Sequence, residues 1–337
     1  MTTICLIPGD GVGQEVIPAA ARVLAAVLPA ARLVQAEAGW DCFSRTGTAL
    51  PAATLAAVAA ADATLFGATQ SPSTVVAGYQ SPILALRKHF DLYANLRPTA
   101  ALPGARSFDL LLVRENSEGL YSGRERLEGA DMAIAERVIT RRASERIAHV
   151  AFTQARAGAR RGQPAHVTVV HKANVLKLSD GLFRTACLDV AAQYPDVSTE
   201  EMLVDAAAMW LVKEPARFAV LVTTNLFGDI LSDLAAGLAG GLGIAPSANL
   251  GADGVAVFEP VHGSAPDIAG RGIANPIGAI LSVALLLEHV QQATAADRVR
   301  GAVQSVLAAG CLPPDLGGSA TTDQVTTAIL QRLEEIA

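Results

Sequence analysis

The fold of this chain is best approached from residues 218 to 233, which read FAVLVTTNLFGDILSD. The first five residues are apolar and typical of a buried strand, and two threonines follow them. A helix with one apolar face is then predicted, with Asn225 placed to cap it. A strand that runs directly into a helix is a unit of α/β architecture. The apolar residues at helical spacing are Leu226, Phe227, Ile230, Leu231, Leu234 and Leu238.

Two aspartates, Asp229 and Asp233, stand one turn apart on the other face of this predicted helix. Like charges at this spacing destabilise a helix slightly, so the presence of both aspartates needs an explanation. Convergent carboxylates suit a hard divalent cation such as Mg²⁺ or Mn²⁺, whereas a solvated acidic face is the plainer alternative. Asp205 could cap the helix that follows it, or it could add a third carboxylate to the same site.

Length and composition indicate a large globular protein that does not bind nucleic acid. The chain has 337 residues, of which 51% are hydrophobic, so two domains are expected. The formal net charge is −6, whereas nucleic-acid binding needs a clustered positive surface. The four cysteines are far apart and form no C-x-x-C motif. This pattern indicates reduced thiols in a cytoplasmic protein.

No segment is expected to direct export or to enter a membrane. The N-terminus lacks the basic start and the small-residue cleavage site of a signal peptide. The most apolar late stretch, residues 277 to 287, is too short to span a bilayer and predicts a buried helix.

A glycine-rich loop follows the first predicted strand, residues 4 to 7. The loop reads PGDGVGQEV at residues 8 to 16 and leads into a helix expected to end near Leu28. Its glycine spacing differs from the dinucleotide fingerprint, and no acidic residue ends a clear second strand about twenty residues later. We therefore reject a Rossmann fold, although these glycines would allow a cofactor to approach the backbone closely.

Short apolar strands alternate with helices along the rest of the chain, which favours α/β architecture. Pro98 is expected to end the regular structure around it. Residues 124 to 146 are rich in charge, and their middle is expected to be helical, in an exposed or subunit-contacting segment.

Polar residues recur after the predicted strands, where ligands bind in open α/β folds. Arg87, Arg97 and Arg114 lie in separate elements and could together clamp a di- or tricarboxylic acid, because guanidinium groups bind carboxylates bidentately. Taken singly, each is more simply a surface arginine.

Three further residues could serve such a site. Lys172 follows a predicted strand, and a lysine near a bound cation can act as a base, although a solvated lysine is commoner. Tyr121 could be an acid, although packing is the commoner role of tyrosine. Asp267 could accept hydrogen bonds from ribose hydroxyls and would repel a 2′-phosphate.

Six segments resemble, in order, those of the β-decarboxylating dehydrogenases, the family of isocitrate, 3-isopropylmalate, tartrate and homoisocitrate dehydrogenases. The resemblance spans essentially the whole chain, and the acidic helix and the sequence HGSAPD at residues 262 to 267 are its most specific parts. The segments are residues 7–13, 91–98, 113–121, 171–174, 224–233 and 259–267.

The resemblance implies a two-domain, isopropylmalate-dehydrogenase-like α/β fold, with a non-Rossmann NAD site and mixed sheets flanked by helices. Residues 1–98 and 247–337 would form the first, NAD-binding domain. Residues 99–246 would form the second, which carries metal and substrate residues and the interface of a homodimer with shared active sites, a tetramer being the further alternative.

Roles for individual residues also follow from the resemblance. Lys172 would be the catalytic base and Tyr121 the acid, and the partner subunit would contribute Lys172, Asn174 and Asp205. Family members that use NADP carry a basic residue where Asp267 stands, so NAD is expected. The Mg²⁺ or Mn²⁺ ligands would be Asp205, Asp229 and Asp233. The substrate-binding residues would be Ser71, Leu84, Arg87, Arg97, Arg114, Tyr121, Lys172 and Asn174. The cofactor-binding residues would be Thr69, Ser71, Asn174, Glu259, His262, Gly263, Ser264, Ala265, Asp267 and Asn275.

The implied reaction is a metal-dependent, NAD-linked oxidative decarboxylation of a small 2-hydroxy-3-carboxy acid. Residues 66–72 and 78–87 look most like the homoisocitrate branch, which would yield 2-oxoadipate, CO₂ and NADH in the α-aminoadipate route to lysine. 3-Isopropylmalate or isocitrate is the alternative, because Ile83 and Leu84 could accept an isopropyl group. Outside the family, a metal-dependent hydrolase or a carboxylate-binding protein could use the same acids and arginines, but a hydrolase would leave Lys172, Tyr121 and Asp267 without roles.

Overall fold

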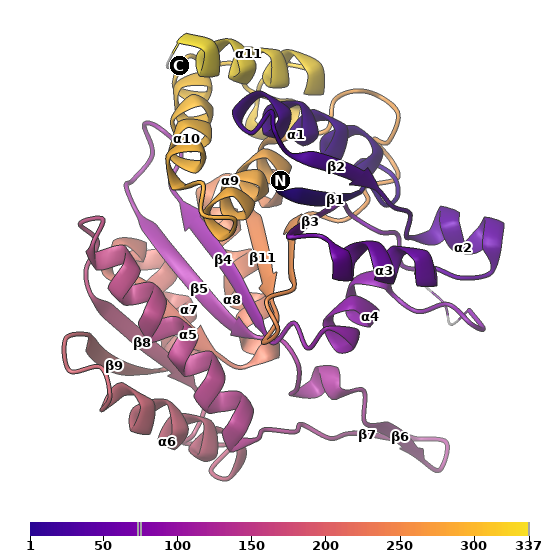
Figure 1. Ribbon diagram of the computed structural model, residues 1–337. Helices are drawn as coiled ribbons and strands as arrows, with labels where there is room; N and C mark the ends of the chain where they lie inside the picture. The colour runs from indigo at the N-terminus through magenta and orange to yellow at the C-terminus, as the bar shows by residue number, and fades with distance from the viewer. Residues whose placement is uncertain (73, 75, 336–337) are drawn as a thin grey trace. The chain divides into compact units, whose positions relative to one another are not determined.

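The computed structural model describes residues 1–72, 74 and 76–335, and these form two compact units (Figure 1). Unit 1 comprises residues 1–90, 102–105 and 239–337, and unit 2 comprises residues 91–101 and 106–238. Both ends of the chain therefore belong to unit 1. Residues 91–98, expected in the first domain, lie in unit 2, and residues 239–246, expected in the second, lie in unit 1.

Unit 1 contains a five-stranded sheet in the order β2-β1-β3-β12-β11. β1 (Thr3–Ile7) pairs in parallel with β2 (Arg32–Gln35) and β3 (Ala63–Phe66). β12 (Ala256–Pro260) pairs in parallel with β3 and antiparallel with β11 (Pro246–Leu250). The sequence did not reveal β2, because this short edge strand is mostly exposed and lacks an apolar run.

Helix α9 (Ile277–His289) forms the centre of unit 1. It packs against β3, β11 and β12 and against the helices beside it, which Figure 1 shows around the sheet. Residues 277 to 287 thus form a buried helix, as predicted, and each buried leucine or isoleucine side chain contributes about 1.5–3 kcal/mol. The other helices are α1 (Gly13–Val27), α2 (Trp40–Thr46), α3 (Ala52–Ala60), α4 (Pro82–His89), α10 (Ala293–Ala308) and α11 (Thr322–Glu335), with 3₁₀ turns η3 (Leu242–Ile244) and η4 (Pro314–Leu316).

Unit 2 contains a mixed sheet in the order β4-β5-β10-β8-β9. β4 and β5 are antiparallel, and the other neighbours are parallel. The strands are β4 (Ala94–Ala100), β5 (Asp109–Glu115), β8 (His166–His171), β9 (Ser198–Leu203) and β10 (Val220–Thr223).

Pro98 lies within β4, so the prediction that it ends regular structure is wrong. Tyr93 and Ala101 hydrogen-bond to the β5 side, and bonded positions alternate along an antiparallel strand. The nitrogen of Pro98 therefore points away from β5, and no ladder bond to β5 is lost.

Residues 124–146 differ from the sequence prediction. They contain the hairpin of β6 (Glu125–Glu128) and β7 (Met132–Ala135), and the helix begins only at Arg141. Gly129, with φ of 73°, permits the reversal between the strands. The helices of unit 2 are α5 (Arg141–Ala159), α6 (Ser179–Ala191), α7 (Val204–Lys213) and α8 (Asn225–Ala239), with 3₁₀ turns η1 (Leu120–Ser122) and η2 (Pro215–Arg217).

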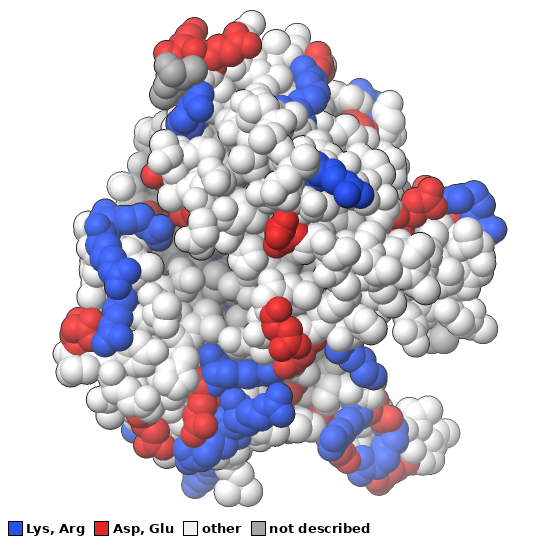
Figure 2. Space-filling view, in the orientation of Figure 1, with Lys and Arg blue, Asp and Glu red and all other residues white. Residues whose placement is uncertain are grey.

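The thiols and the surface agree with the composition. All four cysteines are free, and only Cys311 is partly exposed. On the face in Figure 2, acidic and basic side chains lie beside one another in several groups, and uncharged surface separates these groups. In the described residues, no helix is long and apolar enough to cross a membrane.

Candidate active site

Helix α8 carries the two aspartates that the sequence singled out. β10 ends at Thr223, and α8 begins two residues later, so the start of the helix lies at the carboxyl end of that strand. The side chains of Asp229 and Asp233 are 31% and 51% exposed. Both carboxylates are therefore accessible to solvent and to a ligand.

The apolar face that the sequence predicted for α8 is only partly buried. Leu231 is buried, but Ile230 and Leu238 are 59% and 37% exposed. The described residues leave this side of the helix partly uncovered, so apolar surface is available to another molecule.

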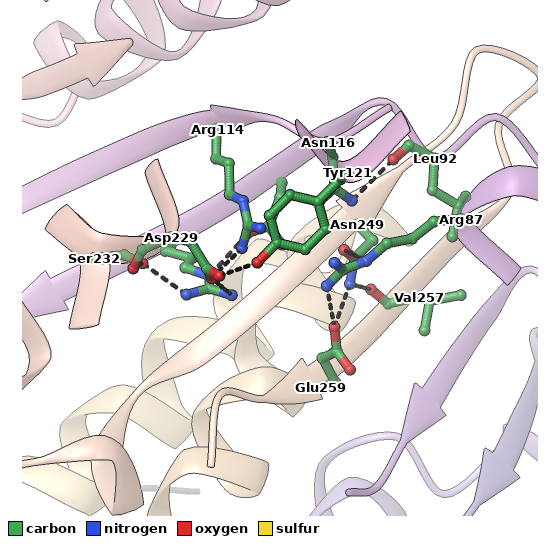
Figure 3. A network of polar contacts seen from close by, with 12 residues as sticks. Arg87, Leu92, Arg114, Asn116, Tyr121, Asp229, Ser232, Asn249, Val257 and Glu259 are labelled. Carbon is green, nitrogen blue, oxygen red and sulfur yellow. Dashed lines mark hydrogen bonds and ion pairs between the residues drawn. The ribbon is translucent and has the colours of Figure 1, made fainter. Parts of the chain in front are cut away.

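Arg114, at the end of β5, is completely buried and reaches the first turn of α8 (Figure 3). Its Nε and Nη2 donate to Asn225 Oδ1 at 3.1 and 2.7 Å, and its Nη1 donates to Asp229. The side-chain oxygen of Asn225, which was predicted to cap α8, therefore orients the guanidinium of Arg114. A Cβ on Gly228 would stand 2.7 Å from Arg114 Cγ, so the arginine can cross the helix only where a glycine lies.

Arg97, in β4, joins the same cluster. Its Nε donates to Asn95 at 2.8 Å, and its Nη1 donates to Ser232 at 2.6 Å and to Asp233 at 3.1 Å. Its Nη2 lies 3.4 Å from Asp229 Oδ1. Burial raises the pKa of Asp233, and the positive charge of Arg97 opposes this rise. Two buried arginines thus face the two aspartates.

Tyr121, in η1, is part of this cluster and is 42% exposed, so it is not a packing residue. Its hydroxyl donates to Asp229 Oδ2 at 2.5 Å, and the guanidinium carbon of Arg114 lies 5.1 Å from its ring centre (Figure 3). Burial raises the pKa of Tyr121, and the bond to Asp229 raises it further. The phenol is therefore kept protonated, as a proton donor must be.

Lys172 and Asp205 form a second group in unit 2. Lys172 Nζ donates to Asp205 Oδ1 at 2.5 Å, and this bond lowers the pKa of Asp205. Asn174 lies two residues farther on and is exposed. Asp205 occupies the first turn of α7, so it remains compatible with a helix-terminal role as well.

Arg87, the third predicted arginine, lies in unit 1 on α4. Its Nε donates to Asn249 at 3.1 Å, and its Nη2 lies 3.2 Å from Glu259, which also accepts from Asn249 at 2.8 Å (Figure 3). Leu84 is 47% exposed and stands one turn before Arg87, on the same side of the helix. Ser71 is also exposed.

The predicted cofactor residues at 262–267 contact the glycine-rich loop within unit 1. Val12 N–H donates to the carbonyl of Ser264 at 2.9 Å, and Gly11, with φ of 56°, leaves no room there for a Cβ. His262 Nδ1 donates to the carbonyl of Gly263 at 2.9 Å, whereas its buried Nε2 has no partner in the described part of the chain.

The remaining predicted cofactor residues have the following surroundings. Burial lowers the pKa of His262, so its Nε2 is an acceptor available to a ligand. Asp267 is exposed, Thr69 is half-buried, and Ala265 has φ of 38°, which is unusual for a residue with a side chain. Asn275 donates to Asp315 at 3.0 Å and accepts from the Ile277 N–H in the first turn of α9.

The family model for isocitrate/isopropylmalate dehydrogenase matches residues 3–329. The chain belongs to this family. The resemblance and the isopropylmalate-dehydrogenase-like α/β fold, with mixed sheets flanked by helices, are thereby confirmed.

Relatives with several substrate names match nearly the whole chain. An isocitrate/homoisocitrate dehydrogenase of Thermus thermophilus is 52% identical over 99% of both chains. A 3-isopropylmalate/3-methylmalate dehydrogenase of Methanocaldococcus jannaschii is 47% identical over 99% of this chain and 100% of its own length. The solved structure of isocitrate dehydrogenase from Methylococcus capsulatus has a TM-score of 0.92 and 43% identity, with 99% of each chain covered.

Enzymes of the isocitrate/isopropylmalate dehydrogenase family use NAD(P) and Mg²⁺ or Mn²⁺, and they carry out oxidative decarboxylation of small carboxylic acids. Membership removes a hydrolase and a non-catalytic carboxylate-binding protein from consideration.

Residues of both units fit these cofactors. Asp229 and Asp233 offer the oxygen ligands that a hard divalent cation prefers. Among the described residues, however, no three acidic, histidine or cysteine side chains could together hold a metal ion. Asp205 therefore does not complete a triad with Asp229 and Asp233 in the part of the chain that the structure describes. The buried Nε2 of His262, which has no partner among the described residues, fits a polar ligand such as NAD.

Sequence reasoning missed most of the residues that hold the arginines, and it gave Asn225 only the role of a helix cap. Asn95, Asn225 and Ser232 each accept a bond from Arg97 or Arg114, and Gly228 gives Arg114 its path. One signal was available, because Asn95 and Arg97 are two residues apart and so share a face of a strand.

Proposed function

We propose that this protein is a homoisocitrate dehydrogenase, which converts homoisocitrate and NAD⁺ into 2-oxoadipate, CO₂ and NADH. The observation that carries the proposal is the cluster in unit 2, where two buried guanidinium groups meet two accessible carboxylates and a tyrosine hydroxyl. Such a set can bind an acid through its carboxylates, hold a cation and donate a proton. The reaction belongs in the α-aminoadipate route to lysine.

Each residue of the cluster has its own role in the proposed reaction. Arg97 and Arg114 bind substrate carboxylates, and an asparagine side chain orients each guanidinium for this role. Tyr121 protonates the β-carbon after CO₂ leaves, which converts the enolate into the 2-keto acid. Lys172 accepts the proton of the C2 hydroxyl.

Two bound groups complete the reaction. NAD⁺ supplies the acceptor of the C2 hydride, and Mg²⁺ or Mn²⁺ supplies positive charge that favours loss of the hydroxyl proton and of CO₂. Asp229 and Asp233 would hold the ion, with Asp205 as the third carboxylate. The loop at 262–267 with Thr69, Ser71 and Asn275 would bind NAD, and Asp267 would favour it over NADP.

We propose further that Lys172, Asn174 and Asp205 serve the active site of a partner subunit in a homodimer. Support comes from exposed apolar side chains, which favour contact with a partner surface. The exposed apolar residues of unit 2 include Leu127, Val175, Leu178, Met209, Val212 and Ile230.

Free, mostly buried thiols fit a cytoplasmic location.

The substrate is the finer part of the proposal. The relative at 52% identity is named for isocitrate and homoisocitrate, which supports the homoisocitrate assignment. Exposed, apolar Leu84 beside Arg87 favours 3-isopropylmalate as the second candidate, because it could contact an isopropyl group. One methylene changes discrimination by only about 1–3 kcal/mol, so overlapping activities are expected.

Purified protein with NAD⁺ and Mg²⁺ or Mn²⁺ should be assayed for NADH production with homoisocitrate, isocitrate and 3-isopropylmalate. We expect the highest kcat/KM with homoisocitrate. A higher kcat/KM with 3-isopropylmalate would overturn the substrate assignment, and absence of NADH with all three would overturn the proposed activity.

A further inference from the structure

Arg137, between β7 and α5, makes a set of contacts that the proposed reaction does not explain. Its side chain is 15% exposed, and its guanidinium carbon lies 5.1 Å from the ring centre of Phe227. Nη1 donates to Ser179 at 3.2 Å and to Asp180, while Nη2 donates to Thr224 at 2.9 Å. One guanidinium thus joins the start of α6 to the start of α8.

Asp180 connects this guanidinium to Lys172. Its carboxylate is completely buried, and while Oδ1 accepts from Arg137, Oδ2 accepts from the backbone N–H of Lys172 at 2.6 Å. The carbonyl of Lys172 in turn accepts from the N–H groups of Val175 and Leu176 at 3.0 and 2.9 Å. The backbone N–H and carbonyl of the lysine are therefore both held, while its ammonium group pairs separately with Asp205.

Thr224 connects the guanidinium to the helix of the aspartates. The residue is buried, and its carbonyl accepts from Gly228 N–H in the first turn of α8 at 2.9 Å. A series of hydrogen bonds therefore connects the turn that contains Lys172 (residues 171–176) to α8, which carries Asp229 and Asp233.

We infer that Arg137 and Asp180 are positioning residues that fix the turn of Lys172 and anchor it on the start of α8. The inference rests on the proposed function, in which Lys172 is the base and must lie within hydrogen-bond reach of the hydroxyl proton. Neither residue touches a reacting atom, and both act by restricting the orientations of the lysine backbone. A small displacement of a catalytic group can cost about 100-fold in rate.

The first test is the steady-state kinetics of Arg137→Gln and Asp180→Asn in the full-length enzyme. We expect kcat to fall about 10- to 100-fold, because the base is misplaced, with KM for the acid and for NAD⁺ changed less than about twofold. Arg137→Lys, which keeps the charge but loses the planar fork, should recover part of kcat. An unchanged kcat, or a loss confined to KM, would overturn the inference.

Arg217→Gln is the matched control. Arg217 also pairs with a carboxylate, Glu200 at 3.3 Å, and also lies over an aromatic ring, Trp210 at 4.6 Å. It is partly buried in unit 2 and contacts β9 and α7 instead of the lysine turn. We expect its kcat to match that of the wild type.

Hydrogen–deuterium exchange tests the inference without relying on activity. Arg137→Gln should speed exchange of residues 171–176 and leave the central part of β8 protected. If exchange at 171–176 stays at the wild-type rate, the positioning role is excluded even if no acid is turned over. This readout separates failure of the inference from failure of the proposed function.

Mixed dimers of Lys172→Met and Asp229→Asn chains assign the effect to one subunit. Each variant alone should be inactive, and random pairing should restore about a quarter of wild-type activity, through the one intact site of each heterodimer. Arg137→Gln should then lower the recovered activity about 10- to 100-fold only when it is placed in the chain that still carries Lys172. Equal loss from either chain would indicate a general structural role and overturn the inference. If the mixed dimers show no activity, the proposal of an active site shared between subunits is wrong. The steady-state kinetics and the hydrogen exchange then decide the role of Arg137.

Discussion

Arg114 reaches its partners because residue 228 has no side chain. The aliphatic part of the arginine lies against α8 at this point, and its guanidinium then meets Asn225 and Asp229. Glycine costs a helix interior about 1 kcal/mol relative to alanine, so the site retains a locally unfavourable residue to admit a buried charge.

Gly228→Ala should therefore lower kcat/KM for the acid by about tenfold or more, because the new methyl group displaces Arg114. Gly301→Ala is the control, since this exposed glycine inside α10 has open space around the position of a Cβ. The control should keep wild-type kinetics and gain up to about 1 kcal/mol of stability. Steady-state kinetics and thermal unfolding measure both effects, and equal kcat/KM in the two variants would contradict the packing argument.

Asp267 gives a second prediction for a single residue. Asp267→Lys should weaken NAD⁺ use and improve NADP⁺ use, because a lysine can pair with a 2′-phosphate where the carboxylate repels it. The ratio of kcat/KM for the two cofactors measures the change. NAD⁺ kinetics that stay as in the wild type would count against the role of Asp267.

Among the strands and helices, apolar runs in the sequence correctly predicted those elements that are buried on both faces. β1, β3, β10 and α9 were all visible in the sequence, because buried elements in α/β units are apolar throughout. β2 and the β6–β7 hairpin were not, because they are exposed and have no burial pattern to impose a period.

The β6–β7 hairpin leads to a prediction about assembly. An isolated two-stranded hairpin is marginally stable in water, and Leu127 and Met132 on it are 72% and 49% exposed. If the hairpin contacts the partner subunit, Leu127→Glu combined with Met132→Glu should lower the mass seen by light scattering at micromolar concentration. Glu128→Gln, on the same exposed strand, should leave the mass unchanged. A double variant that stays fully associated would exclude this hairpin from the interface.

The candidate site shows the same limit of sequence information. Asp229, Asp233, Arg97, Arg114 and Tyr121 were named from the sequence, and the structure brings them into one cluster. The role of their neutral partners was missed, because asparagine and serine carry no distinctive pattern until the fold sets them beside a charge.

For the whole molecule, cysteine exposure gives a test of the core. Burial raises the pKa of Cys5 to about 11 and raises that of Cys187 as well, and Cys42 is buried too. Only thiolates react with iodoacetamide, so at pH 8 the native protein should be labelled first at Cys311. Mass spectrometry should find all four thiols labelled after denaturation, and early labelling of Cys187 would contradict the buried core of unit 2.

The pairing of Arg97 and Arg114 with Asp229 and Asp233 makes the cluster electrically neutral on its own. A divalent cation alone would leave two surplus positive charges, and the three carboxylates of homoisocitrate alone would leave three surplus negative charges. Bound together, the two would leave only one. We therefore expect cation and acid to enter as mutual counterions, each strengthening the apparent affinity of the other when their concentrations are varied together.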